Sequence, residues 1–287
     1  LSSTAFINWK TRPELATQVF SAARLICAVD DEQRQRFEQL YQPNVASLSD
    51  IGLKEKPDIE IIGSLKLNAV STPVDETFAD QLRTAAGSRP ILLAASTHSP
   101  EEQMLLKASQ EVVRAGYPHL LIIAPRHSDR SHDIARLMPQ AAHRSKNQLP
   151  LLGDNHFLAD SFGEMSSLVT AADIVFLGGS FVPKGGHNPL EIAALSTPLI
   201  TGPSQFKNKV EFDTLQQYGQ CITVKDGAAL VKQLTIWLEA LRTDGRAIPQ
   251  DNLDKACAYV KQACERPTKT ARLIIDRLPT QHHPNQN

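Results

Sequence analysis

From residue 89 onward, short apolar runs alternate with longer stretches of helical periodicity. The runs are dominated by Ile, Leu, Val, Ala and Phe and occupy 90–95, 120–124, 173–177, 198–201 and 221–224. Continuous apolar runs of this length are typical of parallel strands that are buried on both faces. Helices are predicted at 100–115, 227–242 and 251–277. Strands that alternate with helices predict right-handed β-α-β units, and therefore an α/β fold with an open parallel sheet covered by helices.

The first 88 residues have a less regular pattern. Residues 12–43 predict one helix, whose buried face is formed by Leu15, Val19, Ala22, Ala23 and Ile26. A short strand is predicted at 59–63 and a polar helix at 75–86. Between them, 69–75 carry turn and extended signals that include Pro73, so this stretch is the predicted interdomain linker.

Composition and charge narrow the possible classes of protein. Of 287 residues, 41% are hydrophobic and 21% are charged, which is ordinary for a globular protein and excludes disordered, collagen-like and disulfide-scaffold classes. Thirty basic and 31 acidic residues give a formal charge of -1, which argues against a nucleic-acid partner. The four cysteines form no C-x-x-C pair and favour reduced thiols in a cytoplasmic compartment. No apolar run approaches the roughly 18–20 residues of a membrane span.

A glycine-rich segment follows the third of the apolar runs. Glycines at 178, 179, 185 and 186 lie within nine residues and allow the backbone to turn sharply and to approach a ligand closely. Asn188 is a good N-cap and Pro189 a good first residue, so a helix is predicted to begin here. Its free amides form a natural phosphate site, and Glu191 in the first turn can reach a pair of sugar hydroxyls.

Other candidate residues also follow predicted strands, at the edge where open α/β sheets bind ligands. Arg126, after Pro125, can pair with phosphate or carboxylate in a bidentate geometry. Arg130, a turn later, lies in the same segment. The alternative is a solvated loop arginine.

Three further candidates are weaker, because each also has a purely structural interpretation. Ser96, Thr97 and His98 form either a helix cap or a ligand contact. Phe162, Gly163 and Glu164 lie just before or inside a helix N-terminus, where Glu164 is either a cap or a ligand contact. Lys66 lies at a strand end, and from the residues alone it is a surface lysine.

Metal and cofactor chemistry is not predicted. His98, His127 and His187 are far apart in the chain, without metal-ligand spacing, and no acidic pair resembles a metal site. No G-x-S-x-G elbow, Walker loop or G-x-G-x-x-G fingerprint is present. We therefore expect neither a metal nor a cofactor.

Five motifs together resemble the signature of the Kdo (3-deoxy-D-manno-octulosonic acid) transferases. They are the segment 178–191, Ser96-Thr97-His98-x-x-Glu101-Glu102, Pro125-Arg126-His127-x-x-Arg130, Gly163-Glu164 and Gly202-Pro203. Their order and spacing also match, and the similarity runs from about residue 59 to 224. The resemblance implies a GT-B fold, in which two Rossmann-like domains face each other across a cleft. It also implies transfer of Kdo from CMP-Kdo to a lipid A precursor (lipid IVA) in lipopolysaccharide assembly.

The resemblance also implies a set of site residues. It gives Lys66 as a stabiliser of the transition state that neutralises the sugar carboxylate or the departing phosphate. It implies CMP-Kdo contacts at Pro125, Arg126, Phe162, Gly163, Glu164, Asn188, Pro189, Leu190 and Glu191. Weaker candidates are Ser96, Thr97, His98, Gly185, Gly186, His187 and Asn208. Three places depart from the family. Phe162 replaces a usual Met, Ser99-Pro100 replaces a more usual Glu-Gly, and Asn208 is displaced as though one residue were inserted.

The same resemblance gives an expected domain organisation. Residues 1–72 are the remnant of an N-terminal acceptor domain with the linker, 73–278 are the donor domain with closing helices, and 279–287 are a polar tail. Leu1-Ser2 resembles the end of the family's Asn-Ala-Arg-Leu-Ser stretch. We therefore expect that about the first third of the enzyme is missing, with its membrane-associating helix and its general base, and that this part places the enzyme at the cytoplasmic face of the inner membrane.

Two functions from other classes stay open on the sequence. One is a GT-B-like epimerase or hydrolase that acts on another nucleotide sugar, without a preference for cytidine. The other is a catalytically inert module that holds a nucleotide or a partner without turnover.

Overall fold

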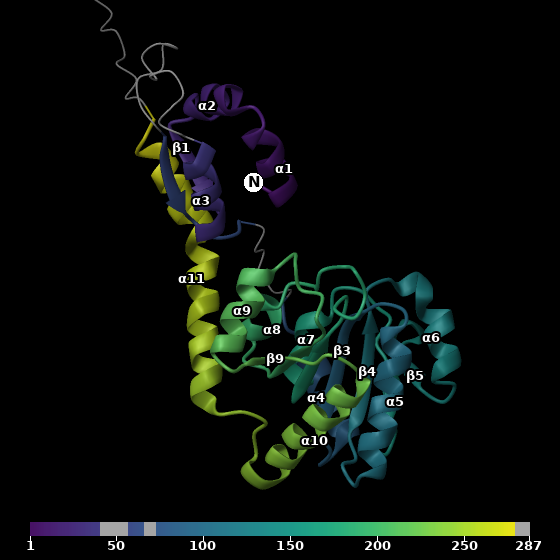
Figure 1. Ribbon diagram of the computed structural model, residues 1–287. Coiled ribbons are helices and arrows are strands. Elements are labelled where there is room, and N and C mark those ends of the chain that lie inside the picture. Colours follow the sequence, from purple (N-terminus) through teal and green to yellow (C-terminus); the bar gives the residue numbers. More distant parts are fainter. Residues whose placement is uncertain (41–56, 66–72, 279–287) are drawn as a thin grey trace, which may run out of the picture. The chain divides into compact units, whose positions relative to one another are not determined.

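The computed structural model describes residues 1–40, 57–65 and 73–278 (Figure 1). They fall into two compact units. One combines the described part of Leu1–Leu67 with the residues from Gln262 onward, and the other spans Asn68–Lys261. The expected donor domain, 73–278, includes a last stretch that packs instead with the first unit. The predicted tail and most of the predicted linker lie outside the described residues.

The first unit contains a small parallel pair of strands. Its elements are α1 (Ser3–Lys10), α2 (Pro13–Ser21), β1 (Leu25–Ala28), α3 (Asp31–Leu40), β2 (Asp58–Ile61) and the end of α11 (Gln250–Ile275). β1 pairs with β2, with Ile26 beside Ile59. The strand predicted at 59–63 is therefore confirmed, although it ends two residues earlier than predicted.

The single helix predicted over 12–43 is wrong. The apolar run of β1 separates α2 from α3, because its backbone pairs with a strand that lies more than twenty residues further along the chain. The predicted buried face also differs. Leu15 and Val19 are 43% and 46% exposed, whereas Ala16 and Thr17 on the neighbouring positions are buried.

The second unit is built on a seven-stranded parallel sheet of the order β5-β6-β4-β3-β7-β8-β9. The strands are β3 (Ile91–Thr97), β4 (Leu120–Pro125), β5 (Ala142–His143), β6 (His156–Leu158), β7 (Ile174–Leu177), β8 (Leu199–Thr201) and β9 (Cys221–Thr223). The five strands predicted from apolar runs are confirmed. β5 and β6 are only two and three residues long, too short to give a periodic signal.

Helices cover both faces of this sheet (Figure 1). They are α4 (Glu76–Ala86), α5 (Glu101–Arg114), α6 (Ser131–Leu137), α7 (Met165–Ala171), α8 (Leu190–Ala194), α9 (Lys209–Gln217), α10 (Gly227–Asp244) and the start of α11. Local sequence sets several of their ends. Asp75 accepts a hydrogen bond from the Phe78 N–H and caps α4, and Asp226 does the same for Ala229 in α10.

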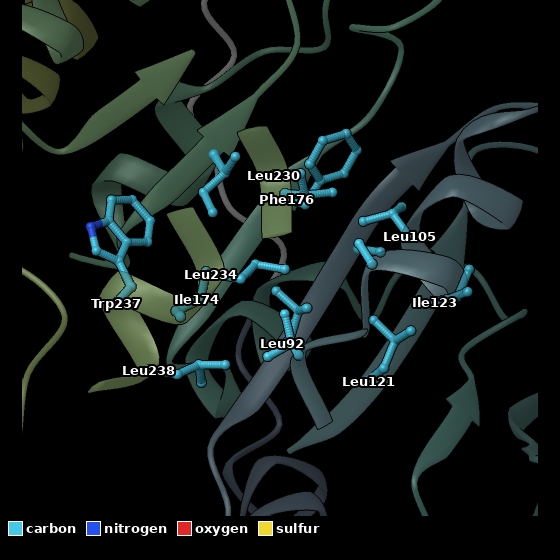
Figure 2. Packing of buried hydrophobic residues seen from close by; sticks show 14 of the residues in the cluster. Leu92, Leu105, Leu121, Ile123, Ile174, Phe176, Leu230, Leu234, Trp237 and Leu238 are labelled. Carbon is cyan, nitrogen blue, oxygen red and sulfur yellow. The ribbon is translucent and has the colours of Figure 1, made fainter. Parts of the chain in front are cut away.

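Alternate residues of the central strands face one core cluster (Figure 2). Leu92, Leu121 and Ile174 point to the same side, where Leu105 of α5 and Leu234 of α10 pack against them. The residues between them along each strand are equally buried, for example Ile91, Leu93, Leu120, Ile122 and Val175. Burial on both faces explains why the strands read as continuous apolar runs rather than as alternating ones.

The order of the strands reverses at the centre of the sheet. The chain moves from β3 to β4 on one side and later returns to place β7 on the other side of β3. Such a reversal opens a crevice beyond the carboxyl ends of the two strands, because their following connections leave in opposite directions. The motifs Ser96–His98 and Gly178–Ser180 follow these two strands.

The core cluster gives a first test of the fold. Phe176 is fully buried in β7, so Phe176→Ala removes a large side chain that little else can replace. We expect a loss of about 3–5 kcal/mol in the free energy of unfolding. Urea titration followed by the fluorescence of Trp237, which lies in the same cluster, measures this loss.

The matched control is Ile236→Ala in α10, because that side chain is 51% exposed. It is expected to change the free energy of unfolding by about 0.5 kcal/mol or less. Equal effects of the two variants would contradict the described packing.

Candidate functional site

The carboxylate of Glu101 joins the ends of β3 and β7. Its two oxygens accept hydrogen bonds of 2.8–2.9 Å from four backbone N–H groups, those of His98, Gly179, Ser180 and Phe181. Glu101 is 1% exposed, so these bonds replace its hydration. Both segments that follow the central strands are therefore fixed by one side chain in the first turn of α5.

The two segments also approach each other closely through their backbones. A Cβ atom at Gly178 would lie 2.6 Å from the carbonyl oxygen of Ser96 and 2.7 Å from the Cα atom of Thr97, so only glycine fits there. Ser96 itself has a φ of 53° and interrupts the regular pairing of β3 with β4. Backbone strain of this kind at a non-glycine residue often accompanies a functional site.

A cavity of about 190 Å³ lies at this reversal of strand order. Five of the predicted site residues contribute to its wall, although they come from three separate segments of the chain: Ser96, Arg126, His187, Asn188 and Glu191. Apolar side chains complete the wall, among them Met165 and Ile192. The structure therefore brings together residues from the ends of β3, β4 and the glycine-rich segment.

Arg126 supplies the positive charge of this cavity. It is exposed, and within residues 1–40, 57–65 and 73–278 its guanidinium has no ion-pair partner within 4.0 Å. Its backbone N–H donates to the Thr97 carbonyl and so fixes the residue beside β3. An exposed guanidinium at this position can bind a phosphate or carboxylate in a bidentate geometry.

Two other arginines near this edge have carboxylate partners. Arg130 donates to both oxygens of Glu102, at 2.7 and 3.1 Å, so its charge is compensated within the protein. Arg144 donates to Glu164, with its Nε 2.9 Å from Oε1. Arg126 therefore differs from both in having its charge available to a ligand.

Glu191 lies on the same cavity wall in the first turn of α8. Burial raises the pKa of its carboxyl group, although the nearby charge of Arg126 acts in the opposite direction. A half-buried carboxylate of this kind can accept hydrogen bonds from two neighbouring hydroxyls of a sugar.

The helix after the glycine-rich segment begins later than predicted. Its first residue is Leu190, its N-cap position is Pro189, and it has five residues. The Asn188 side chain still accepts a hydrogen bond from the Leu190 N–H, at 3.1 Å, as a capping residue does. Pro189 and Leu190 are buried, so their side chains pack into the core rather than into the cavity.

Asn208 positions the second glycine pair. Its amide Nδ2 donates to the Gly186 carbonyl at 3.2 Å, and the Lys207 N–H donates to the Gly185 carbonyl. Both glycines have positive φ values, 80° and 71°, and a Cβ atom at Gly185 would lie 2.7 Å from the Phe206 ring. The predicted residues Gly185, Gly186 and Asn208 therefore shape the loop, and none of the three lines the cavity.

The segment 162–164 lies outside the cavity wall but directly before Met165, which belongs to it. Phe162 is 73% exposed and Gly163 has a φ of 84° with open space around it. Glu164 occupies the N-cap position of α7 without a capping hydrogen bond. Burial alone would raise the pKa of Glu164, but hydrogen bonds from Arg144 and Ser161 outweigh it and hold the pKa below its ordinary value.

Three histidines that are distant in the sequence meet beside this cavity. His98 and His187 place their Nε2 atoms 2.9 Å apart, and the angle between their ring planes is 4°. His127 presents its ring to His98 edge-on, with centroids 5.6 Å apart. In the part of the chain that the structure describes, no group of three His, Cys, Asp or Glu residues is arranged to hold a metal ion.

The predicted residues Thr97 and Pro125 do not line the cavity. Thr97 is fully buried, and Pro125 is the half-buried last residue of β4. Lys66 lies outside the described residues. A larger hollow, of about 490 Å³, lies away from these residues between α5 and α10, where Lys107 and Glu111 line it.

Comparisons with known proteins agree on one family. The chain is 37% identical to the 3-deoxy-D-manno-octulosonic acid transferase of Haemophilus influenzae over 203 residues, which are 69% of this chain and 44% of that protein. A solved structure described as the C-terminal CMP-Kdo binding domain of WaaA from Acinetobacter baumannii is 27% identical, with a TM-score of 0.53. The match covers 67% of this chain and 98% of that domain. The chain is a homologue of the Kdo transferases.

The similarity to Kdo transferases covers only part of the length of those proteins. The chain spans about half the length of the curated relatives it matches. A glycosyltransferase structure from Rickettsia africae, 12% identical with a TM-score of 0.55, covers 97% of this chain and 69% of that one, and shows the shared fold alone. No protein-family model matches the chain. The resemblance found in the sequence motifs and the predicted GT-B-type α/β fold are confirmed.

Sequence reasoning missed two features of this site. Glu101 was part of a motif and of a predicted helix start, but its contacts with the segment after β7 depend on the three-dimensional pairing of the strands. The histidine cluster was missed because His98, His127 and His187 are far apart in the chain, and their spacing does not show that they meet in the fold. The signal that could have revealed both is position, since all of these residues lie in segments that follow the carboxyl ends of β3, β4 and β7.

The Glu101 contacts generate a testable prediction. In Glu101→Gln, one carboxylate oxygen becomes an NH2 group, so two of the four buried N–H groups lose their acceptor. We expect a loss of at least about 2 kcal/mol in the free energy of unfolding, because each unpaired buried donor costs about 1–3 kcal/mol. Chemical denaturation measures the loss.

Glu111→Gln is the matched control, because it makes the same chemical change at an exposed position of the same helix. It is expected to leave the free energy of unfolding nearly unchanged. If Glu101→Gln has the same free energy of unfolding as the wild type, the four hydrogen bonds do not hold the two segments.

Proposed function

We propose that this chain binds CMP-Kdo and serves as the donor-binding part of a Kdo transferase, which moves Kdo to a lipid A precursor. The observation that carries the proposal is the cavity where Arg126, Asn188 and Glu191 converge at the reversal of strand order. Homology to the Haemophilus influenzae enzyme and the likeness to the CMP-Kdo binding domain of WaaA support this choice of donor over other nucleotide sugars.

In this proposal Arg126 binds the phosphate of CMP. The reaction breaks the bond between the anomeric carbon of Kdo and a phosphate oxygen, so negative charge grows on that phosphate as CMP leaves. A guanidinium on the cavity wall can stabilise this charge. Arg126 therefore contributes to binding and more strongly to the departure of CMP.

Glu191 and Asn188 are proposed to recognise the nucleoside. The Glu191 carboxylate would accept hydrogen bonds from the two ribose hydroxyls, which also offsets the cost of its burial. Asn188 contributes its amide group beside it. The exposed segment 162–164 next to Met165 is proposed to contact the base.

Lys66, the acceptor and the membrane enter the proposal through the family resemblance. Lys66 would neutralise the Kdo carboxylate or the leaving phosphate. The acceptor would be lipid IVA, presented at the cytoplasmic face of the inner membrane. Among the residues that the structure describes, no helix has both the length and the apolar character needed to cross a membrane.

Two substitutions test the assignment of phosphate and ribose. Arg126→Ala is expected to weaken the binding of both CMP and inorganic phosphate by about 10- to 150-fold, because a charge-assisted hydrogen bond contributes about 1.5–3 kcal/mol. Glu191→Ala is expected to weaken the binding of CMP and to leave that of phosphate unchanged. Titration calorimetry with CMP, UMP and phosphate measures these affinities.

Arg136→Ala is the matched control, because this arginine is largely exposed on α6, outside the cavity wall. It should bind CMP as the wild type does. A wild-type preference for UMP over CMP would point instead to an enzyme of another nucleotide sugar. CMP affinity that survives Arg126→Ala and Glu191→Ala would refute the site.

A further inference from the structure

The histidine pair beside the cavity shares a hydrogen bond that constrains its protons. His98 follows β3 and His187 lies in the glycine-rich segment, and their Nε2 atoms are 2.9 Å apart. At this distance one nitrogen must donate and the other accept. The neutral pair therefore holds one proton between the rings, and a lone pair remains on one Nδ1 atom.

The backbone is shaped to accommodate this pair. Gly179 has a φ of 69°, and a Cβ atom there would lie 3.0 Å from both Cδ2 and Nε2 of His187. The Glu101 carboxylate holds the backbone N–H of His98 and that of Gly179, so both rings lie against fixed segments. The contact between the rings is thus part of the built site.

The pair can take up one further proton but not two. A single added proton converts the remaining Nδ1 acceptor into a donor and leaves the Nε2 hydrogen bond intact. A second one would put two N–H groups face to face at 2.9 Å and is excluded by this geometry. The pair is therefore a unit that carries a charge of zero or plus one.

Charged groups from several elements surround the pair. Those that face His98 are Glu101, His127, Lys184 and Glu102, and those that face His187 are Arg126, Lys207 and His127. Burial and then the neighbouring cations lower the pKa of His187 to about 4, and burial lowers the pKa of His98 as well. With the cavity empty, the pair is uncharged near neutral pH.

We propose that the His98–His187 pair takes up one proton when an anion occupies the cavity beside Arg126, and that it then binds this anion as a cation. The identity of the anion, the phosphodiester of a cytidine nucleotide, rests on the proposed function. In the free chain, burial and then repulsion from Arg126 and Lys207 disfavour the protonated form, and the negative charge of the ligand favours it. The protonated pair adds an N–H donor and a second positive charge to the cavity.

The sign of the pH dependence follows from this proton uptake. Because the complex holds more protons than the free chain, affinity rises as the pH falls, between the higher pKa of the pair in the complex and its lower pKa in the free chain. The increase is at most about tenfold per pH unit for one proton. A ligand with a titrating phosphate would obscure this, since a phosphate monoester has a pKa near 6.

The test uses cytidine 5′-methyl phosphate, a phosphodiester whose charge is constant from pH 5.5 to 7.5. Calorimetric titrations in two buffers of different ionisation enthalpy give the number of protons taken up on binding. We expect net uptake and tighter binding at pH 5.5 than at pH 7.5. The double variant His98→Gln/His187→Gln should abolish the uptake and flatten the pH profile, because each single variant leaves one ring that can still take the proton. His132→Gln, at an exposed position of α6, should change neither.

Each other outcome has a definite meaning. Binding without proton uptake in the wild type overturns the inference and leaves the proposed function intact. Uptake that persists in the double variant assigns the proton to another group, such as Glu191, and also overturns it. No binding of the nucleotide at either pH refutes the proposed function and the inference together. Equal thermal stability of the variants and the wild type excludes misfolding as the cause.

Discussion

The carboxylate of Glu101 determines the geometry of the carboxyl edge of the sheet. It is buried beside the central strands, where an unpaired negative charge would be strongly unfavourable, and four backbone N–H groups solvate it instead. Those N–H groups belong to the segments after β3 and after β7, so the interaction fixes both strand ends at once. The close approach at Gly178, the bend at Ser96 and the space for two imidazole rings at Gly179 all depend on this arrangement.

Around this edge, some charged side chains are paired with each other within the protein, whereas others are available to a ligand. Glu102 and Glu164 each have an arginine partner, and both pairs keep their charges compensated within the protein. The cavity, in contrast, holds Arg126 without such a partner in the described part of the chain, together with the raised pKa of Glu191 and the lowered pKa of His187. An anionic ligand compensates Arg126 and favours the protonated histidine pair, and its hydroxyl groups can bind Glu191. Groups whose charges are incompletely balanced in the free protein are typical of binding sites.

Much of this fold follows from the sequence because buried parallel strands have an unambiguous pattern. β3, β4 and β7 were predicted within two residues, since each is built on a continuous apolar run and a helix follows each one along the chain. β5 and β6 were not predicted, because strands of two or three residues gain their order from neighbours rather than from their own composition. The helix predicted over 12–43 failed for a related reason. The run Leu25–Ala28 fits a helical face, and only its partner Asp58–Ile61 decides that it is a strand.

The site shows the same division between local and long-range information. Arg126, Asn188 and Glu191 could be predicted because each directly follows a strand or begins a helix. The contacts of Glu101 and of the histidines could not, because they join segments that are about 80 and 90 residues apart. Spacing along the chain predicts ligand sets within one element, but it carries no information on residues that meet at the reversal of a sheet.

A crystal structure of this chain with CMP bound tests the central claim most directly. The account predicts the phosphate within hydrogen-bonding distance of the Arg126 guanidinium and the ribose hydroxyls at the Glu191 carboxylate, in the cavity beside Ser96 and His187. Nucleotide bound elsewhere, for example in the hollow between α5 and α10 near Lys107, would contradict it.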